Sequence, residues 1–168
     1  MRAPLSHQSH DKYKTRIESL INLYASQSKN LDINIESHSH NAKYLAVLVS
    51  GYLEQAVKEL LLGFASQGSR PQISRYIEET WPISRNMNTK SIQEILYQFN
   101  SSWAEKFINW LEEAENRKGD INSIVTWRNS IAHGQESNTT GVTLVSVKAK
   151  FVTVKSLIGF IEDTLHHV

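Results

Sequence analysis

Residues 41–64, NAKYLAVLVSGYLEQAVKELLLGF, form a long segment with helical periodicity. Its apolar side chains recur three or four residues apart, at Leu45, Leu48, Val49, Tyr52, Leu53, Ala56, Val57, Leu60 and Leu61. A face this broad is typical of a central helix that has neighbours on two sides. Gly68 and Pro71, residues that commonly end helices, follow the segment. The segment therefore predicts the central helix of an all-α protein.

The flanking segments also have the helical period. Residues 11–27 place apolar side chains at helical spacing, and a polar interval over residues 28–39 separates them from the central segment. Downstream, residues 72–80 and 90–99 predict two shorter helices, with Pro82 in the break between them. Four helices are therefore expected within the first hundred residues.

The next helix has a clearer start signal. Ser102 and Glu105 form a predicted capping box, and Gly119 is the expected stop. Asp120 is expected to cap a further helix, which runs to Gly134 as a terminal glycine.

The remaining residues contain the one ambiguous segment. Residues 135–141 predict a polar loop, and residues 142–147 also suit a short strand because they alternate and are rich in β-branched side chains. Helical periodicity returns at Val154, Leu157, Ile158, Ile161 and Leu165. We expect one all-α domain over residues 1–168, an up-and-down bundle of four to six helices with a flexible start over residues 1–10.

Composition excludes several classes of function. The sequence has no cysteine, which excludes disulfides, thiolate zinc sites and a cysteine nucleophile. Its net charge of +1 lacks the basic excess of proteins that bind nucleic acid mainly through phosphates, so any RNA contact must be local or made by a dimer. No apolar run approaches the roughly 18 residues of a membrane span, and the amino terminus lacks the apolar core of a secretion signal. We expect a cytoplasmic protein without membrane contact.

Residues 120–134, DINSIVTWRNSIAHG, carry a charged side chain inside an apolar stripe. On a helical wheel, Arg128 falls in the middle of the stripe formed by Ile121, Ile124, Val125, Ile131 and Ala132. A guanidinium keeps its proton, so burying it without a partner would cost several kcal/mol. Arg128 must therefore meet a carboxylate, an anion or a solvent-filled cleft, which can lie at a subunit interface.

His133 lies about 140° from Arg128 on an ideal helix, so one straight helix does not direct both side chains at one atom. They can converge if the helix end unwinds at Gly134, or if two copies pair across a two-fold axis. The alternative interpretation is structural, with Arg128 in an ion pair and His133 favoured by the helix dipole.

The string WRNSIAHG at residues 127–134 resembles the signature of HEPN ribonucleases, in which an Arg is followed by four to six residues and a His. Arg128 and His133 match the shortest spacing, and Asn129 matches the polar residue that often follows the Arg. Residues 48–54, LVSGYLE, are similar to the RiboL-PSP branch of HEPN domains. The resemblance covers roughly residues 40–165.

The resemblance implies a four- or five-helix bundle that dimerises through the motif-bearing helices. It also implies metal-independent RNA cleavage, with toxin or antiviral-defence roles in many members and an antitoxin or another effector-system protein as a partner. Some relatives have lost catalysis. The alternative for this chain is therefore a non-catalytic RNA-binding or dimerisation module.

The motif residues suit RNA cleavage by the neighbouring 2′-hydroxyl. His133 is the expected proton carrier, and Arg128 offers a forked cation to the phosphate. Asn129 is expected to orient the phosphate or His133, with surface hydrogen bonding as the alternative. Glu54 is expected to hold Arg128 across the bundle, or else to pair with Lys58 on its own helix.

A glycine, two tryptophans and several histidines are candidates for roles in packing, base stacking or metal binding. Gly51 costs about 1 kcal/mol relative to alanine within a helix, so we expect it to allow close helix packing, with the motif-bearing helix as a candidate neighbour. Trp81 and Trp127 suit the core or base stacking. Closely spaced histidines occur at His7/His10, His38/His40 and His166/His167. Their spacing is poor for helix-borne metal ligands, so we expect surface histidines, no metal and no cofactor.

Overall fold

The computed structural model describes residues 9–27, 35–81 and 86–166 of the chain. These residues form seven α-helices and one short 3-10 helix: α1 (Ser9–Gln27), α2 (Ile35–Ser66), α3 (Pro71–Thr80), α4 (Thr89–Phe99), α5 (Ser101–Glu112), α6 (Asn116–Ala132), η1 (Glu136–Thr139) and α7 (Leu144–His166). The prediction of an all-α bundle is confirmed. The described residues form more α-helices than the four to six expected for the bundle, and these match the seven segments in which the sequence has helical periodicity or helix start signals.

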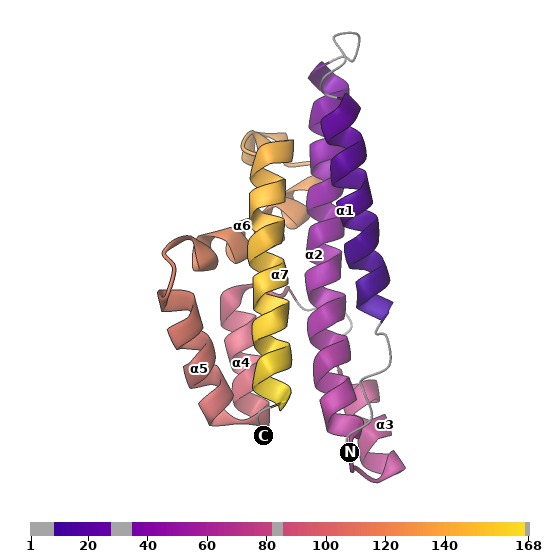
Figure 1. Cartoon of the computed structure of the whole chain (residues 1–168), viewed down its shortest axis with the longest axis vertical. Helices are drawn as coiled ribbons and strands as arrows, with labels where there is room; N and C mark the ends of the chain where they lie inside the picture. Colours follow the sequence, from indigo (N-terminus) through magenta and orange to yellow (C-terminus); the bar gives the residue numbers. More distant parts are fainter. Residues whose placement is uncertain (1–8, 28–34, 82–85, 167–168) are drawn as a thin grey trace.

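Three long helices, α1, α2 and α7, run side by side along the long axis of the molecule (Figure 1). The shorter α4 and α5 form a pair beside the carboxyl-terminal half of α7, where Phe160 of α7 stacks on Trp110 of α5. The sixth helix passes behind α7 and reaches α2. No helix in the described part of the chain is long and apolar enough to cross a membrane.

The central helix α2 packs against α1, α6 and α7, as its broad apolar face predicts. Of the apolar positions that define that face, Leu48 alone is only partly buried. The helix begins at Ile35, so it takes up the second part of the polar interval expected over residues 28–39. Residues 28–34, like Pro82, lie outside the described residues.

Two predicted helix boundaries in the second half of the chain are wrong. The cap of α5 is Asn100, whose side-chain oxygen accepts from the Ser102 backbone N–H at 2.9 Å, so Ser102 does not form the expected capping box. The next helix begins at Asn116, which places Gly119 and Asp120 inside α6 instead of at a stop and a cap. Asp120 does not cap a helix because its carboxylate bonds to side chains of α6 and α7.

The ambiguous residues 142–147 are not a strand, because α7 begins at Leu144. Thr143 and Ser146 cap this helix reciprocally. The Thr143 N–H donates to Ser146 Oγ at 2.9 Å, and the Ser146 N–H donates to Thr143 Oγ1 at 3.1 Å. These two bonds satisfy orphan donors in the first turn and therefore select helix over strand.

The start of the described chain is more ordered than the sequence predicts. Helix α1 includes Ser9 and His10, and His10 is only 2% exposed. Its Nδ1 lies 2.9 Å from Glu59 Oε2, and its Nε2 lies 3.7 Å from Glu162 Oε1. His10 is therefore an anchor between α1, α2 and α7, which corrects the expectation of a surface histidine in a flexible start. Residues 1–8 and His167 lie outside the described residues.

The remaining described histidines are partly or fully accessible. His38 is half-buried near the start of α2, while His40 and His166 are exposed. No group of His, Asp or Glu able to hold a metal ion occurs among the described residues.

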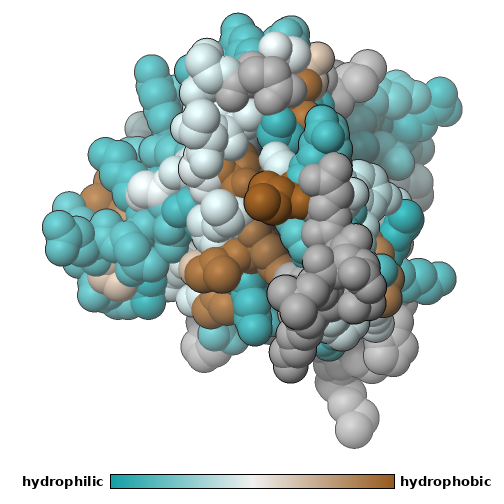
Figure 2. All heavy atoms as spheres, turned by 90° about the horizontal axis from the view of Figure 1, so that it is seen from above, coloured by the Kyte–Doolittle hydropathy of each residue, from teal (hydrophilic) through white to brown (hydrophobic). Residues whose placement is uncertain are grey.

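The end of the bundle where α1 stops and α2 and α7 begin has an apolar hollow. Figure 2 looks onto this end and shows apolar side chains gathered near its middle. The hollow has a volume of about 420 Å³, and its lining includes Ile35 and Val145, which are 85% and 79% exposed. This surface contains none of the motif residues.

Candidate active site

The first half of α6 is fixed to its neighbours by polar contacts. Asp120 accepts hydrogen bonds from Lys150 Nζ at 2.8 Å and from Thr153 Oγ1 at 2.7 Å, both on α7. Asn122 Oδ1 accepts from the backbone N–H of Thr89 at 3.0 Å, at the first residue of α4. The first half of α6 is therefore fixed to α4 and α7, and the second half, which carries the motif, extends from it.

The Asp120 contacts hold that carboxylate in its charged form. Burial would raise its pKa, but the hydrogen bonds from Lys150, Thr153 and Asn116 outweigh this and keep the pKa below its usual range. Sequence patterning did not reveal this role, because Asp near a helix start more commonly predicts a cap.

The carboxyl end of α6 closes in a Schellman motif. Gly134 has a φ of +66°, its N–H donates to the Ile131 carbonyl at 3.2 Å, and the Gln135 N–H donates to the Ser130 carbonyl at 2.8 Å. The helix therefore stays regular to Ala132, with His133 as its C-cap residue. Of the two routes expected to bring Arg128 and His133 together, unwinding of the helix end does not occur.

Arg128 lies half-buried at the seam between α2 and α6. Its Nη1 donates to Asn129 Oδ1 at 3.1 Å, which is the one side-chain bond it makes with the described residues. The guanidinium therefore keeps donors that a bound anion can use.

The carboxyl of Glu54 on α2 feels the charge of this guanidinium. Burial raises the pKa of Glu54, and the positive charge of Arg128 opposes part of that rise. Within the described chain, Glu54 forms no direct ion pair with Arg128 or with Lys58. The expected contact between Glu54 and Arg128 is thus electrostatic and acts across the seam.

His133 is exposed, unlike Arg128, and its N–H donates to the Asn129 carbonyl at 3.0 Å. Asn129 thus contacts Arg128 through its side chain and His133 through its backbone. No hydrogen bond joins the Arg128 and His133 side chains among the described residues. On a regular helix the two point about 140° apart, so one protomer does not aim both at one phosphate.

The tryptophans contribute packing around the site. Trp127 is partly buried against the core, with Lys150 Nζ 5.3 Å from its ring centroid and Gly141 beside it. Trp81 also packs partly against the core. Both residues therefore fit the core alternative better than base stacking.

Two residues of the 48–54 stretch have surroundings that the sequence did not predict. Gly51 is exposed, and a Cβ there would meet nothing within 4 Å, so the expected close helix packing at Gly51 does not occur within the chain. Its neighbour Ser50 is fully buried, and its Oγ lacks a hydrogen-bond partner among the described residues. No sequence signal singled out Ser50, because a lone serine on a helix carries no information about its partners.

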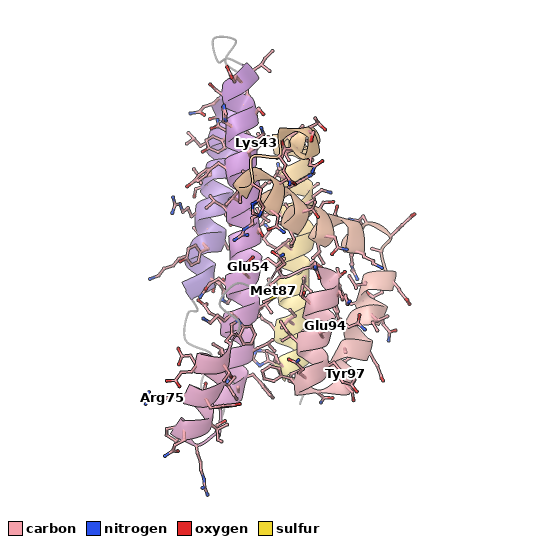
Figure 3. The ribbon with its side chains drawn as sticks, turned by 180° about the vertical axis from the view of Figure 1, so that it is seen from behind. Lys43, Glu54, Arg75, Met87, Glu94 and Tyr97 are labelled. Atoms are coloured by element: carbon pink, nitrogen blue, oxygen red, sulfur yellow. The ribbon has the colours of Figure 1, made fainter. Side chains whose placement is uncertain are left out.

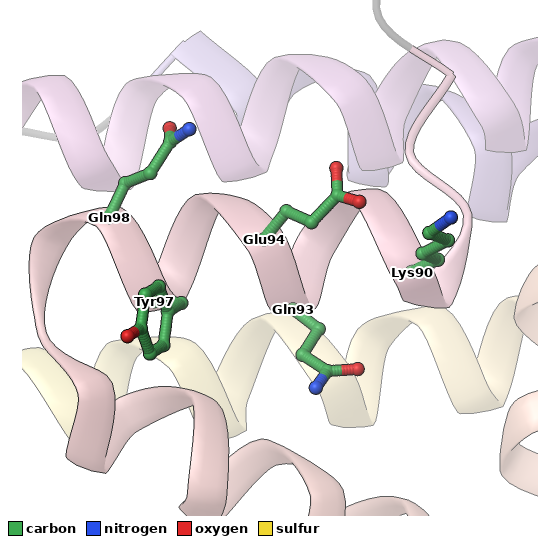
Figure 4. Close-up of a pocket in the computed structure, with 5 residues that line it drawn as sticks. All are labelled: Lys90, Gln93, Glu94, Tyr97 and Gln98. Carbon is green, nitrogen blue, oxygen red and sulfur yellow. The ribbon is translucent and has the colours of Figure 1, made fainter.

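The described surface has a hollow on α4 that is separate from the motif residues. This hollow has a volume of about 470 Å³ and is lined by Lys90, Gln93, Glu94, Tyr97 and Gln98 (Figure 4). Arg128, Asn129 and His133 do not line it, nor do they line the hollow beside Ile108 or the one beside Ile35.

Comparison with known protein families covers nearly the whole chain. The family model described as RiboL-PSP-HEPN matches residues 11–167. The chain belongs to the RiboL-PSP-HEPN family. Its resemblance to this branch is thereby confirmed, and the match includes α1, beyond the 40–165 range that the motifs suggested. No curated protein and no solved structure matches this HEPN chain.

Proposed function

We propose that this HEPN protein is a metal-independent endoribonuclease that works as a homodimer through the Arg128/His133 end of α6. The observation that carries the proposal is the state of Arg128. It is held half-buried on α6 without a direct carboxylate partner in the described chain, five residues before an exposed histidine. A cation kept in this way suits an anionic ligand.

The reaction is an intramolecular transesterification of RNA. The 2′-hydroxyl oxygen attacks the neighbouring phosphorus, and its proton passes to the imidazole of His133. The P–O5′ bond breaks, and the leaving 5′-oxygen takes a proton from the imidazolium form of His133 of the partner subunit. The products are a 2′,3′-cyclic phosphate and a 5′-hydroxyl.

Each residue has a distinct role in this reaction. Arg128 donates to phosphate oxygens and stabilises the charge that builds up in the transition state. Acid–base catalysis by a positioned histidine contributes on the order of 10²–10⁴-fold. Asn129 orients the guanidinium, because its side chain accepts a hydrogen bond from Arg128 Nη1. Glu54 favours a defined position of the guanidinium through its charge.

The divergence of Arg128 and His133 on α6 supports the dimer in this proposal. Since the helix stays regular to Ala132, a single chain does not bring both side chains to one phosphate. A two-fold axis near this helix end would place the two Arg128–His133 pairs around one phosphodiester and enclose it.

Incubating single-stranded RNA with the purified protein in excess chelator tests the proposal. We expect cleavage to cyclic-phosphate ends, its loss in His133→Ala, and its retention in His40→Ala, a control that removes an exposed histidine from α2. Cleavage that the chelator abolishes would contradict the mechanism. RNA binding without cleavage by the wild-type protein would support the non-catalytic module instead.

We extend the proposal to a toxin or antiviral-defence role, held in check by an antitoxin or another effector-system protein. This rests on family membership together with an accessible His133, which a partner protein can cover. Expression of the wild-type chain should arrest growth and expression of His133→Ala should not. Equal growth of both strains at matched protein levels would contradict the toxin role.

A further inference from the structure

Ser50 is a buried hydroxyl that no internal contact explains. The residue is 0% exposed, and its Oγ has no hydrogen-bond partner among the described residues. Leaving such a group unsatisfied costs on the order of 1–3 kcal/mol, whereas alanine at the same helical position would cost nothing of this kind. The buried Oγ is therefore an open acceptor for a donor that approaches it in another state.

The faces of α2 show which neighbour covers Ser50. Tyr44 accepts a hydrogen bond from Arg16 at 3.1 Å, and Glu59 binds His10 at 2.9 Å, so these two residues mark the side toward α1. Ser50 lies about 120° from Tyr44 and about 180° from Glu59 around the helix, but only about 40° from Glu54. Ser50 therefore lies on the side of α2 turned away from α1, close in angle to Glu54, whose carboxyl feels the charge of Arg128 on α6.

The position of Ser50 along α2 matches the motif-bearing end of α6. Figure 3 shows Lys43 and Glu54 on the side of α2 that α6 crosses, with the carboxyl-terminal part of α6 passing between them. Ser50 lies between these two residues in the sequence, one helical turn from Glu54. The last turns of α6, which carry Arg128, thus cover the segment of α2 that contains Ser50.

We propose that Ser50 is a positioning residue for Arg128 and that its hydroxyl accepts a hydrogen bond from the guanidinium when a phosphate is bound. This inference rests on the proposed function. In the resting state, Nη1 of Arg128 donates to Asn129 Oδ1. In the phosphate-bound state, one N–H of the Arg128 guanidinium donates to Ser50 Oγ, and its other N–H groups donate to the phosphate. The buried hydroxyl thus gains a hydrogen-bond partner when the guanidinium binds the substrate.

The test compares Ser50→Ala with Thr164→Ala. Thr164 is also a buried hydroxyl, but its Oγ1 donates to the Phe160 carbonyl at 2.8 Å on α7, away from the motif. We expect Ser50→Ala to melt roughly 2–12 °C higher than the wild type and to lose roughly 10- to 100-fold in cleavage rate. Thr164→Ala should melt lower and cleave at the wild-type rate below its melting temperature.

A second readout does not depend on cleavage. With a 2′-deoxy oligonucleotide, the Nε–Hε signal of Arg128 in NMR spectra should become protected from solvent exchange in the wild type and stay unprotected in Ser50→Ala. Wild-type cleavage and Arg128 protection in Ser50→Ala would overturn the proposal. If the wild type binds the oligonucleotide but does not cleave RNA, the nuclease proposal fails, and the Arg128 signal still decides whether Ser50 positions the guanidinium.

Discussion

Arg128 is a cation at a half-buried position on α6. Asn129 Oδ1 accepts a hydrogen bond from its Nη1, and its charge acts on the carboxyl of Glu54 on α2. It forms no ion pair with Glu54 among the described contacts, so its other N–H donors can bind a phosphate.

The raised pKa of Glu54 predicts how the free energy of unfolding depends on pH. Since burial raises this pKa, the folded protein binds the proton more tightly than the unfolded chain does. The free energy of unfolding therefore falls as pH rises from about 4.3, the ordinary Glu value, through the folded pKa. Glu54→Gln removes this slope, so its stability relative to the wild type should be higher at pH 7 than at pH 4.

Urea unfolding at the two pH values measures this difference. Glu105→Gln, at an exposed position of α5, controls for the substitution itself. A relative stability of Glu54→Gln that declines between pH 4 and pH 7 would contradict the burial of this carboxyl.

Arg128 and His133 stood out in the sequence as candidate site residues, whereas Ser50 did not. Arg128 was visible because a charge inside an apolar stripe violates the helical pattern, and His133 because its spacing from Arg128 matched a family motif. Ser50 violates no pattern, since serine is tolerated on most helical faces. Its significance depends on which atoms surround Oγ, and these are set by the crossing of α2 and α6.

Helix α6 carries the motif residues, and its two ends make different contacts. Its start is joined to α7 through Asp120 and to α4 through Asn122. Its end is closed by the turn at Gly134, which leaves His133 exposed as the C-cap residue.

Replacing Gly134 should destabilise the end of α6. Its φ of +66° lies in the left-handed region, where a side chain costs roughly 1–2 kcal/mol. Gly134→Ala should therefore lower the free energy of unfolding by about 1 kcal/mol. Gly119→Ala is the matched control, because Gly119 lies inside α6 with open space around it and should gain up to about 1 kcal/mol. Changes of the same sign in both variants, measured by urea unfolding, would contradict the assigned helix end.

Asp120→Asn should weaken the joint between α6 and α7 in a pH-dependent way. The bonds that lower the Asp120 pKa stabilise the fold above the ordinary Asp value of about 3.9, and this contribution is lost as pH falls through the folded pKa. At pH 7 the variant should lose about 1–3 kcal/mol of unfolding free energy, and the loss should shrink below pH 3. Glu78→Gln on α3 is an exposed control. A loss that is equal at both pH values would contradict the role of the charge.

The positions of the helices were easier to predict from the sequence than the residues at which they begin and end. Apolar periodicity located the helices because burial dominates their energetics. Their ends depend on single caps, and several residues competed for that role. Asn100 capped α5 in place of Ser102, and Asp120 was drawn into a contact with α7 that lies 30 residues away in sequence.

At the scale of the whole molecule, one chain presents only half of the proposed reaction centre. The bundle is complete around α2, yet Arg128 and His133 diverge on α6. The net charge of +1 also argues for a local phosphate contact and against a broad basic surface. Sequence reasoning reached the family and the two motif residues, but periodicity carries no information on how protomers meet.

The most direct test mixes active and inactive protomers. The wild type and His133→Ala are unfolded together and refolded as mixed dimers in excess chelator, then assayed on single-stranded RNA. Each mixed dimer retains one His133, whereas the proposed reaction uses one His133 as the base and His133 of the partner subunit as the acid. A reaction centre built from both protomers therefore predicts inactive mixed dimers, so that activity falls as the square of the wild-type fraction, with cyclic-phosphate ends on the products. Activity that falls in direct proportion to the wild-type fraction, in samples of correctly folded mixed dimers, would contradict a reaction centre built from both protomers.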